Sequence, residues 1–431
     1  MVATRADATA VDTPEIRRRD WQIISLIGAA HACSHFFQLV FPTLFLSLAN
    51  EYGYDFAQLG LLVSTFFLVS CFGQASSGFV VDRIGPAPVL RFGLMGFVAA
   101  GVLIAFSNGY IMLLLAAVLG GLGNSVFHPV DYSIINHRVS IKRLGHAFST
   151  HGFTGYLGWA LTPVFMAFLI QVFNWRVAAA GAAALVAVVM FFTWLGRDLL
   201  AGTNQAHDQQ PQAATPHPAD LSTQSVGHTL RILLAQPALW GAFLFFAFTA
   251  AALSAIQNYT IPMLGAIYGI DKIMAGTALS AYMVTAAGGM VLGGFLVGAT
   301  PKTERIVAAS LFLAGGMLII LATGVVAPWL AIVLVASAGL LSGISAPSRD
   351  MLIRRVTPKG ATGTVYGLVY SGMDVGSSLA PVAFGIMLDM GWGVGPWYAA
   401  AASFAMGAVM AVLVAISASR SQYSATRPVA G

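Results

Sequence analysis

Histidine, proline and aspartate end an otherwise apolar stretch in "GLGNSVFHPVDYSIINHRV", residues 121–139. His128 and Asp131 are three residues apart, so on a helix they share a face and can share a hydrogen bond or a proton. Pro129 lacks an N–H group and frees a carbonyl one turn earlier, which predicts a bend. His151 lies at a similar depth in the next apolar stretch. These residues predict a bent, polar inner end of a helix, although a helix boundary beside water would also explain Asp131.

A second polar face lies in the first apolar stretch. His31, His35 and Gln38 are spaced i, i+4 and i+7, which places them on one side of a helix that Pro42 should bend. Unperturbed histidine titrates at about pH 6.5, so a pair lining a cavity can carry protons. The same side chains could instead only form hydrogen bonds that hold neighbouring helices together.

The last third of the chain carries two further candidates. Tyr366, Tyr370 and Asp374 recur every four residues, and Asp374 lies well inside its apolar stretch, where a carboxyl group can load and release a proton. Packing of a buried polar group is the alternative interpretation of Asp374. Arg349 and Asp350 form a charge cluster that matches Asp131 in the first half, and we assign them to the same inner-mouth polar cluster as His128, Asp131 and His151.

Composition predicts the elements that carry these residues. Of the 431 residues 58% are hydrophobic and 9% charged, whereas soluble domains carry about 25% charged residues. Apolar runs long enough to cross a bilayer as helices recur from Trp21 almost to Ser419, and the alternation typical of barrel strands does not. We expect an all-α membrane protein with twelve transmembrane helices.

The positions of the basic residues predict the orientation. If the N-terminus is cytoplasmic, all of the 21 Lys and Arg except Arg176 and Lys272 fall in cytoplasmic segments. Both termini are then cytoplasmic, in a bacterial-type inner membrane. This bias accounts for the net charge of +5, so nucleic-acid binding is not expected. Cys33 and Cys71 lie within apolar runs, show no metal or disulfide spacing, and are expected to pack.

A polar, proline-containing segment divides the apolar runs into six and six. The expected segments are a cytoplasmic tail (1–20), a six-helix half (21–196), a cytoplasmic linker (197–235), a second six-helix half (236–419) and a cytoplasmic tail (420–431).

The two halves resemble each other. Gln38 precedes Asn258 by 220 residues, and Asp131 precedes Asp350 by 219. A parallel repeat of six spans is typical of one transporter architecture, which binds substrate and coupling ions near the midplane between the repeats. The expected substrate and proton cavity comprises His31, His35, Gln38, Asn258, Tyr366, Tyr370 and Asp374.

The segment after the second span reads "GFVVDRIG". Gly78, Asp82, Arg83 and Gly85 fit the G-x-x-x-D-R-x-G signature, and with twelve spans and a central linker the chain resembles the major facilitator superfamily. The resemblance implies a gating loop in which Asp82 faces a basic partner or a helix N-terminus. The second-half copy "GFLVGATPK" lacks the Asp-Arg pair, so the gating latch is expected to be asymmetric or weak.

Within that family, residues 30–165 resemble the group around the fosmidomycin resistance protein, a drug exporter. The likeness rests on "HACSHFFQLVFPTLF", "FAQLGLL", "GNSVFHP" and "LGHAFSTHGFTGYLGWALTP". That group has an acid where His35 stands here, and another where this chain has Val130, so substrate and coupling do not carry over.

The leading hypothesis is a proton-coupled exporter (antiporter) of a small drug-like or anionic compound, with a proton gradient as energy source and no cofactor. A proton-coupled uptake symporter for an organic acid is the alternative. A membrane enzyme or a transport-dead sensor fits less well, because no catalytic or metal motif accompanies the histidines and no phosphate-binding loop appears. We expect a monomer whose partners are substrate, protons and the bilayer.

Overall fold

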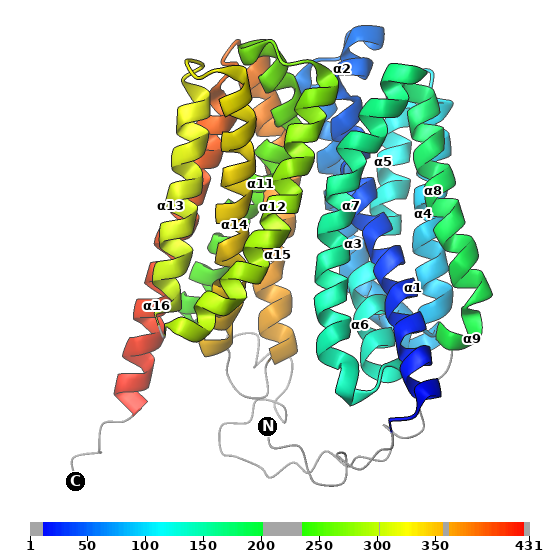
Figure 1. The fold of residues 1–431 in the computed structure, drawn as a ribbon, viewed down its shortest axis with the longest axis vertical. Helices are drawn as coiled ribbons and strands as arrows, with labels where there is room; N and C mark the ends of the chain where they lie inside the picture. The colour runs from blue at the N-terminus through cyan, green and yellow to red at the C-terminus, as the bar shows by residue number, and fades with distance from the viewer. Residues whose placement is uncertain (1–11, 201–234, 301, 357–361, 426–431) are drawn as a thin grey trace.

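The computed structural model describes residues 12–200, 235–300, 302–356 and 362–425, which form a bundle of long helices (Figure 1). Within these residues, twelve segments are long and apolar enough to cross a membrane, which confirms the expected all-α membrane protein. The first helix begins and the last helix ends at the same end of the bundle. We call this the proximal end and the opposite one the distal end.

The helices keep the order of the two expected halves. The first half contains α1 (Pro14–Gln38), α2 (Val40–Tyr52), α3 (Phe56–Ile84), α4 (Pro86–Ala105), α5 (Tyr110–Asn124), α6 (Phe127–Arg138), the short 3₁₀ helix η2 (Ile141–Arg143), α7 (Leu144–Val172), α8 (Trp175–Leu195) and α9 (Arg197–Leu200). The second contains α11 (Pro237–Tyr268), α12 (Lys272–Ala299), α13 (Thr303–Ala322), α14 (Pro328–Val356), α15 (Thr362–Asp389) and α16 (Gly395–Ala425). Of the expected linker, residues 201–234 lie outside the described part of the chain.

Polar side chains at the distal turns set several helix starts. Asp55 accepts from the N–H of Gln58, whose side chain accepts from the N–H of Asp55, a capping box that begins α3. The side chains of Asn174 and Asp271 accept from N–H groups in the first turns of α8 and α12 and so cap these helices. Each cap satisfies N–H groups that the helix itself leaves without partners.

Two membrane spans of the first half are broken. The first is divided between α1 and α2 at Leu39, and the fourth is divided between α5 and α6 at Ser125 and Val126. Each break precedes a proline by three or four residues, Pro42 in one span and Pro129 in the other. Proline removes the hydrogen bond to the carbonyl four residues earlier, which explains why the predicted bends occur here.

The two halves meet mainly along two helix pairs, α3 with α15 and α7 with α12, with a smaller contact between α2 and α11. Gly60 in α3 lies against the Pro381 backbone of α15, where a Cβ atom would collide with the carbonyl oxygen. Gly276 in α12 lies against the Pro163 carbonyl of α7, at 3.3 Å from an ideal Cβ. The same glycine–proline contact therefore appears once in each interface, as a parallel repeat requires.

Charged and polar contacts join the halves at the distal end. The two carboxylate oxygens of Asp389, the last residue of α15, accept from the N–H groups of Phe56 (2.9 Å) and Ala57 (2.7 Å) at the start of α3. Within the second half, Tyr259 in α11 donates to the carbonyl of Pro381 in α15. An aspartate from one half thus caps a helix of the other.

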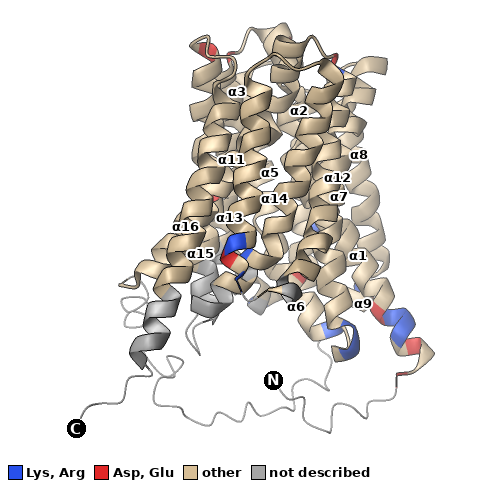
Figure 2. Ribbon diagram, turned by 60° about the vertical axis from the view of Figure 1, so that its left-hand side comes forward, with Lys and Arg blue, Asp and Glu red and all other residues tan. Residues whose placement is uncertain are grey.

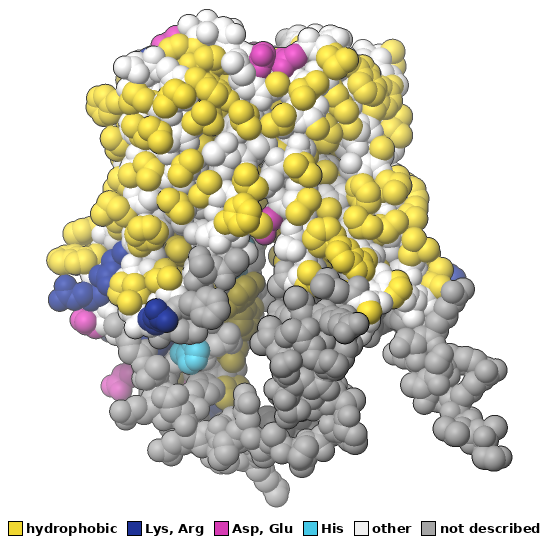
Figure 3. Space-filling model, turned by 180° about the vertical axis from the view of Figure 1, so that it is seen from behind, with side chains coloured by type: hydrophobic (Ala, Val, Ile, Leu, Met, Phe, Trp, Pro, Cys, Tyr) yellow, Lys and Arg dark blue, Asp and Glu magenta, His cyan; other side chains and the backbone are white. Residues whose placement is uncertain are grey.

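The surface has the composition of a membrane protein. Hydrophobic side chains cover the sides of the bundle in Figure 3. Phe295 and Leu379 are among the exposed large hydrophobic residues. Charged residues gather towards the helix ends, most of the basic ones at the proximal end (Figure 2). Arg176 at the distal end is paired with Glu51 at 2.7 Å. The protein is a multi-pass membrane protein.

Candidate functional site

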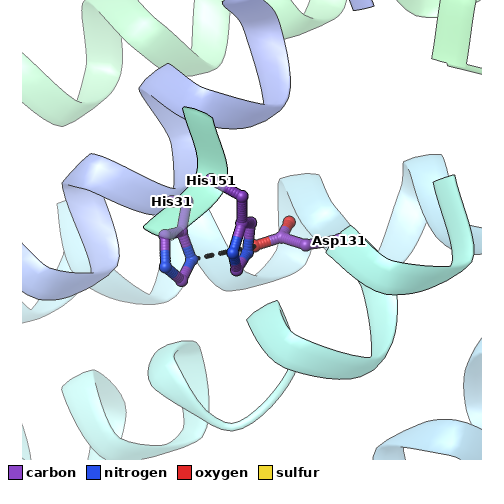
Figure 4. Close-up of side chains that lie close together, drawn as sticks. All are labelled: His31, Asp131 and His151. Carbon is purple, nitrogen blue, oxygen red and sulfur yellow. Dashed lines mark hydrogen bonds and ion pairs between the residues drawn. The ribbon is translucent and has the colours of Figure 1, made fainter. Parts of the chain in front are cut away.

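Three buried side chains from three helices meet inside the first half. The carboxylate oxygen Oδ2 of Asp131 lies 3.0 Å from Nδ1 of His31 and 3.1 Å from Nε2 of His151 (Figure 4). The two imidazole rings stack with centroids 3.5 Å apart. Asp131 is fully buried, and His31 and His151 are 2% and 5% exposed. We call these three residues the histidine–aspartate cluster.

Local structure explains how the cluster forms. The break in the fourth span starts a new helix, α6, in which Asp131 lies in the second turn. On α7, Gly155 lies one turn after His151 and leaves room for the rings of α1, because a Cβ atom there would be 2.9 Å from His35 and 3.1 Å from His31. The sequence therefore places a residue without a side chain where three helices bring rings together.

Two further histidines surround the cluster. The His35 ring lies 4.5 Å from that of His31, and the His128 ring lies 5.7 Å from it. His128 and Tyr132 are exposed, and the Tyr132 ring lies 5.3 Å from that of His151. The cluster therefore has an accessible side formed by α6 and a closed side formed by α1 and α7.

A chain of amide and indole groups continues beyond His35. The His35 ring contacts Trp159 at 4.2 Å, and the Trp159 indole donates to the Gln38 amide at 2.9 Å. Gln38 donates to Asn124 (3.1 Å), which donates to Ser70 (2.8 Å). These bonds join α1, α3, α5 and α7, and they hold Gln38 beside the break between α1 and α2.

Two buried atoms of this region have no hydrogen-bond partner among the described residues. They are Oδ1 of Asp131 and Nδ1 of His35. A buried polar atom without a partner costs about 1–3 kcal/mol. Such atoms commonly indicate where water, a proton or a ligand completes the site.

The cluster also offers atoms to a metal ion. One donor atom each from His31, Asp131 and His151 lies within 4.8 Å of the others. However, both nitrogens already lie at hydrogen-bond distance from the same oxygen, and the ring planes differ by only 25°. The lone pairs of imidazole nitrogens lie in the ring planes, and two stacked, nearly parallel planes converge poorly on one ion, so the geometry favours hydrogen bonds to Asp131.

A separate pocket lies in the second half. Its wall includes Phe246 of α11, Tyr282 of α12 and Arg349 of α14, and α7 of the first half adds Tyr156. The Arg349 guanidinium stands 5.0 Å from the centre of the Phe246 ring. The Tyr282 hydroxyl lies 2.9 Å from that of Ser342. This mainly apolar pocket with one cation and paired hydroxyl groups can hold an anionic, partly apolar molecule.

The structure groups the predicted residues differently from the sequence. His31 and His35 were assigned to the cavity and Asp131 to the inner mouth, yet they belong to one assembly. The alternative interpretation of Asp131 as a residue at a water boundary is wrong, because the side chain is fully buried. Arg349 is separate from this assembly and packs on Phe246.

The other predicted cavity residues are dispersed. Asp374 in α15 is half-buried and lies near the thiol of Cys71 in α3, in the other half. The Tyr370 ring packs against that of Phe246 in a tilted arrangement, with centroids 4.6 Å apart. Asn258 is buried and donates to the carbonyl of Ser254 in its own helix. The side chains of Tyr366 and Asp350 lie outside the described part of the structure.

The predicted gating loop is helical. Gly78, Asp82 and Arg83 belong to α3, which continues to Ile84, and the turn comes at Gly85 with φ +82°. Only glycine adopts this backbone conformation readily. The surroundings of Gly78 and the Asp82 side chain lie outside the described residues, so the latch stays a prediction.

Several residues of the site were missed. Trp159, Asn124, Phe246 and Tyr156 lie in apolar runs, where they are indistinguishable from packing residues by sequence. Trp159 follows His151 by eight residues, about two helical turns, which is the one signal that could have linked them.

Comparisons with known proteins agree with this fold. A fosmidomycin resistance protein of Escherichia coli is 25% identical over 282 residues, 64% of this chain and 65% of that protein. The matched region thus spans slightly less than two thirds of that relative. A probable nitrate/nitrite transporter of Mycobacterium tuberculosis is 24% identical over 80% of this chain and 83% of its own length.

A solved structure and a family model extend the match over the whole chain. A bacterial homologue of the human lysosomal transporter Spinster superposes with a TM-score of 0.71 at 17% identity, covering 97% of this chain and all of that one. The Major Facilitator Superfamily model matches residues 27–381 and, in a second match, 247–430. The chain therefore belongs to the major facilitator superfamily, and the relatives named above are transporters rather than enzymes.

Proposed function

We propose that this transporter exports a small organic anion in exchange for protons, and that the histidine–aspartate cluster binds the transported proton. The buried shared contact of His31 and His151 with Asp131 is the observation that carries the proposal. Ionisable groups inside a membrane protein are costly and commonly belong to ion or proton pathways.

The chemistry of the cluster suits one exchangeable proton. A carboxylate that accepts from two neutral imidazoles leaves the cluster with a net charge of −1, and one added proton makes it neutral. Burial disfavours a net charge, whereas access to water through exposed His128 and Tyr132 lets the proton leave. The cluster therefore can bind a proton in one conformation and release it in another.

The second-half pocket supports an anionic substrate. Arg349 is the charged residue among the described residues that line it, and the aromatic rings of Phe246, Tyr156 and Tyr282 supply an apolar surface. Relatives are named for fosmidomycin resistance and for nitrate and nitrite transport, and these compounds are anions in water. The resistance protein also favours export as the direction.

Helix α7 connects the two sites. It carries His151 of the cluster, Tyr156 of the pocket and Trp159, which contacts His35. Movement of α7 when the cluster gains or loses a proton would change the pocket wall. In this way α7 alone could couple proton binding at the cluster to substrate binding at the pocket.

Asp374 is a second candidate for the proton. It lies at the interface of the halves with Cys71 as partner, so a change in its charge would act on the contact between α3 and α15. The cluster is favoured because three ionisable groups lie within hydrogen-bond distance of one another there, whereas Asp374 lies beside a thiol.

The proposal includes the orientation. The proximal end carries Arg17, Arg18, Lys142 and Arg143, and this excess of basic residues supports a cytoplasmic position for it in a bacterial-type inner membrane. Both termini are then cytoplasmic. We propose that the protein acts as a monomer, because the repeat supplies both halves of the cavity within one chain.

Inside-out membrane vesicles with an acidic lumen test the proposal. Adding fosmidomycin, nitrate or a small aromatic acid outside should release protons from the lumen, as reported by a trapped pH-sensitive dye. In Asp131→Asn, which keeps the shape but cannot ionise, proton release should be lost while exchange of labelled for unlabelled substrate continues. The exposed His137, bonded to the carbonyl of Ser133 in its own helix, supplies the matched control His137→Ala.

The other outcomes are equally informative. Full proton release in Asp131→Asn, together with its loss in Asp374→Asn, would move the coupling site to Asp374. Uptake of a substrate by whole cells without proton release in the vesicles would contradict export and support the symporter.

A further inference from the structure

A groove at the proximal end lies outside both sites. It runs between α1 and the end of α8, and its lining residues are Arg18, Trp21, Gln22, Ser25, Leu26, Phe192, Leu195, Gly196 and Leu199. We call it the interfacial groove. All of its lining residues belong to the first half, in α1, in α9 and at the end of α8.

The lining changes from polar to apolar along α1. Arg18 and the 44% exposed Trp21 lie near the helix start, whereas Leu26 and the 54% exposed Phe192 lie deeper. Arg18 and Leu26 are eight residues apart, about 12 Å along a helix. Tryptophan favours the boundary between head groups and acyl chains. The groove thus presents a cation at head-group level above an apolar wall at acyl-chain level.

Arg18 is available for a ligand, unlike its neighbours. Arg17 pairs with Asp12 at 3.4 Å, and Arg143 pairs with Asp12 and with Asp20, the latter at 3.6 Å. Within residues 12–200 and the other described ranges, nothing bonds to the exposed Arg18 guanidinium. One arginine of this basic region is therefore free while the adjacent ones are engaged.

Gly196 keeps the groove open. A Cβ atom at this position would lie 2.5 Å from Cδ1 of Leu26, the end of a flexible side chain. A larger residue here would fill the space between α1 and α8. Replacing this glycine is therefore a direct way to block the groove.

We propose that the interfacial groove binds an anionic phospholipid of the membrane leaflet at the proximal end. Arg18 would bind its phosphate, and Leu26, Phe192 and Leu195 would line one acyl chain. Basic pockets between transmembrane helices on the cytoplasmic side suit such head groups. A soluble anion would leave the apolar wall uncovered. This lipid site is independent of the transported substrate.

Native mass spectrometry of the full-length protein in detergent tests the proposal with equal amounts of phosphatidylglycerol and phosphatidylcholine of matched chains. The protein should retain one phosphatidylglycerol in preference to phosphatidylcholine. Because one basic residue near the membrane surface contributes about fivefold to anionic lipid binding, Arg18→Gln should lower the preference by about that factor. The matched control Arg17→Gln should leave it unchanged, and Gly196→Leu should abolish the retained lipid.

Three results would overturn the assignment. They are equal retention of both lipids by the unaltered protein, equal effects of Arg18→Gln and Arg17→Gln, and displacement of the lipid by millimolar glycerol 3-phosphate, which would indicate a soluble anion. Thermal unfolding and substrate exchange of each variant should match the unaltered protein, so a loss of lipid binding cannot be ascribed to misfolding.

Discussion

The two halves share one architecture but differ where chemistry is concentrated. In the first half, two spans are broken and the histidine–aspartate cluster forms beside the breaks. In the second half, α11 and α14 run without a break through Pro262 and Pro347, and a pocket with Arg349 forms between them. Proline alone therefore does not break a span.

Side-chain partners account for part of this difference. Gln38, next to the break at Leu39, turns away from its own helix to bond with Asn124 and Trp159. Its counterpart Asn258 bonds back to Ser254 one turn earlier, inside a continuous helix. The repeat places Gln38 and Asn258 at equivalent positions. The side chains of neighbouring helices decide whether such a residue bonds within its own helix or to residues of other helices.

The largest effect in the second half is expected from Arg349→Gln. Loss of a hydrogen bond to a charged group costs about 1.5–3 kcal/mol, so substrate Kd should rise about 10- to 150-fold, measured by binding to purified protein. Arg349→Lys keeps the charge without the planar fork and should lose less. An unchanged Kd in Arg349→Gln would remove the pocket from substrate binding and leave the first half as the only described candidate.

Paired glycine substitutions compare the two interfaces. Gly60→Ala places a methyl group against the Pro381 backbone and 2.8 Å from the Tyr259 hydroxyl, whereas Gly276→Ala meets Pro163 at 3.3 Å. Overpacking costs about 1–3 kcal/mol. Gly60→Ala should therefore lower the equilibrium constant for the conformation in which the halves meet at the distal end, by about 5- to 150-fold. Gly276→Ala should lower it much less. Distances between spin labels on the two halves measure this equilibrium. Equal shifts in both variants would show that the interfaces are equivalent.

His35→Ala tests the unpartnered nitrogen of the first half. If the buried Nδ1 bonds to substrate, its loss should raise Kd about 2- to 10-fold, the range of an ordinary hydrogen bond at about 0.5–1.5 kcal/mol. If His35 instead takes part in proton transfer, the pH dependence of transport should change while Kd does not. A variant that alters neither quantity would leave His35 with a packing role.

The smallest effect is expected from Asp389→Asn. The carboxylate caps α3 across the halves, and such a charge at a helix N-terminus contributes about 0.3–1 kcal/mol. Removing this charge should lower the equilibrium constant for the conformation with the halves in contact at the distal end, by about two- to fivefold, as measured by the distances between spin labels. Asp55→Ala removes the cap of the same helix from within one half, so it should lower the thermal stability and leave the equilibrium unchanged.

The sequence by itself determined the class of protein and its plan. Long apolar runs can cross a bilayer only as helices, and the spacing of such runs predicted twelve spans without any tertiary information. Pro42 and Pro129 marked both broken spans, because the loss of a backbone donor is a local property. The resemblance to the transporter family also required only short motifs.

Only the tertiary structure decided which polar residues act together. His31, Asp131 and His151 are separated by up to 120 residues, and their contact depends on how α1, α6 and α7 cross, which helical periodicity does not specify. The tertiary structure also separates Arg349 from Asp131, although Arg349 is adjacent to Asp350, the counterpart of Asp131 in the repeat. Periodicity predicts the face on which a residue lies, whereas the packing of helices, set here by residues such as Gly155, determines which faces meet.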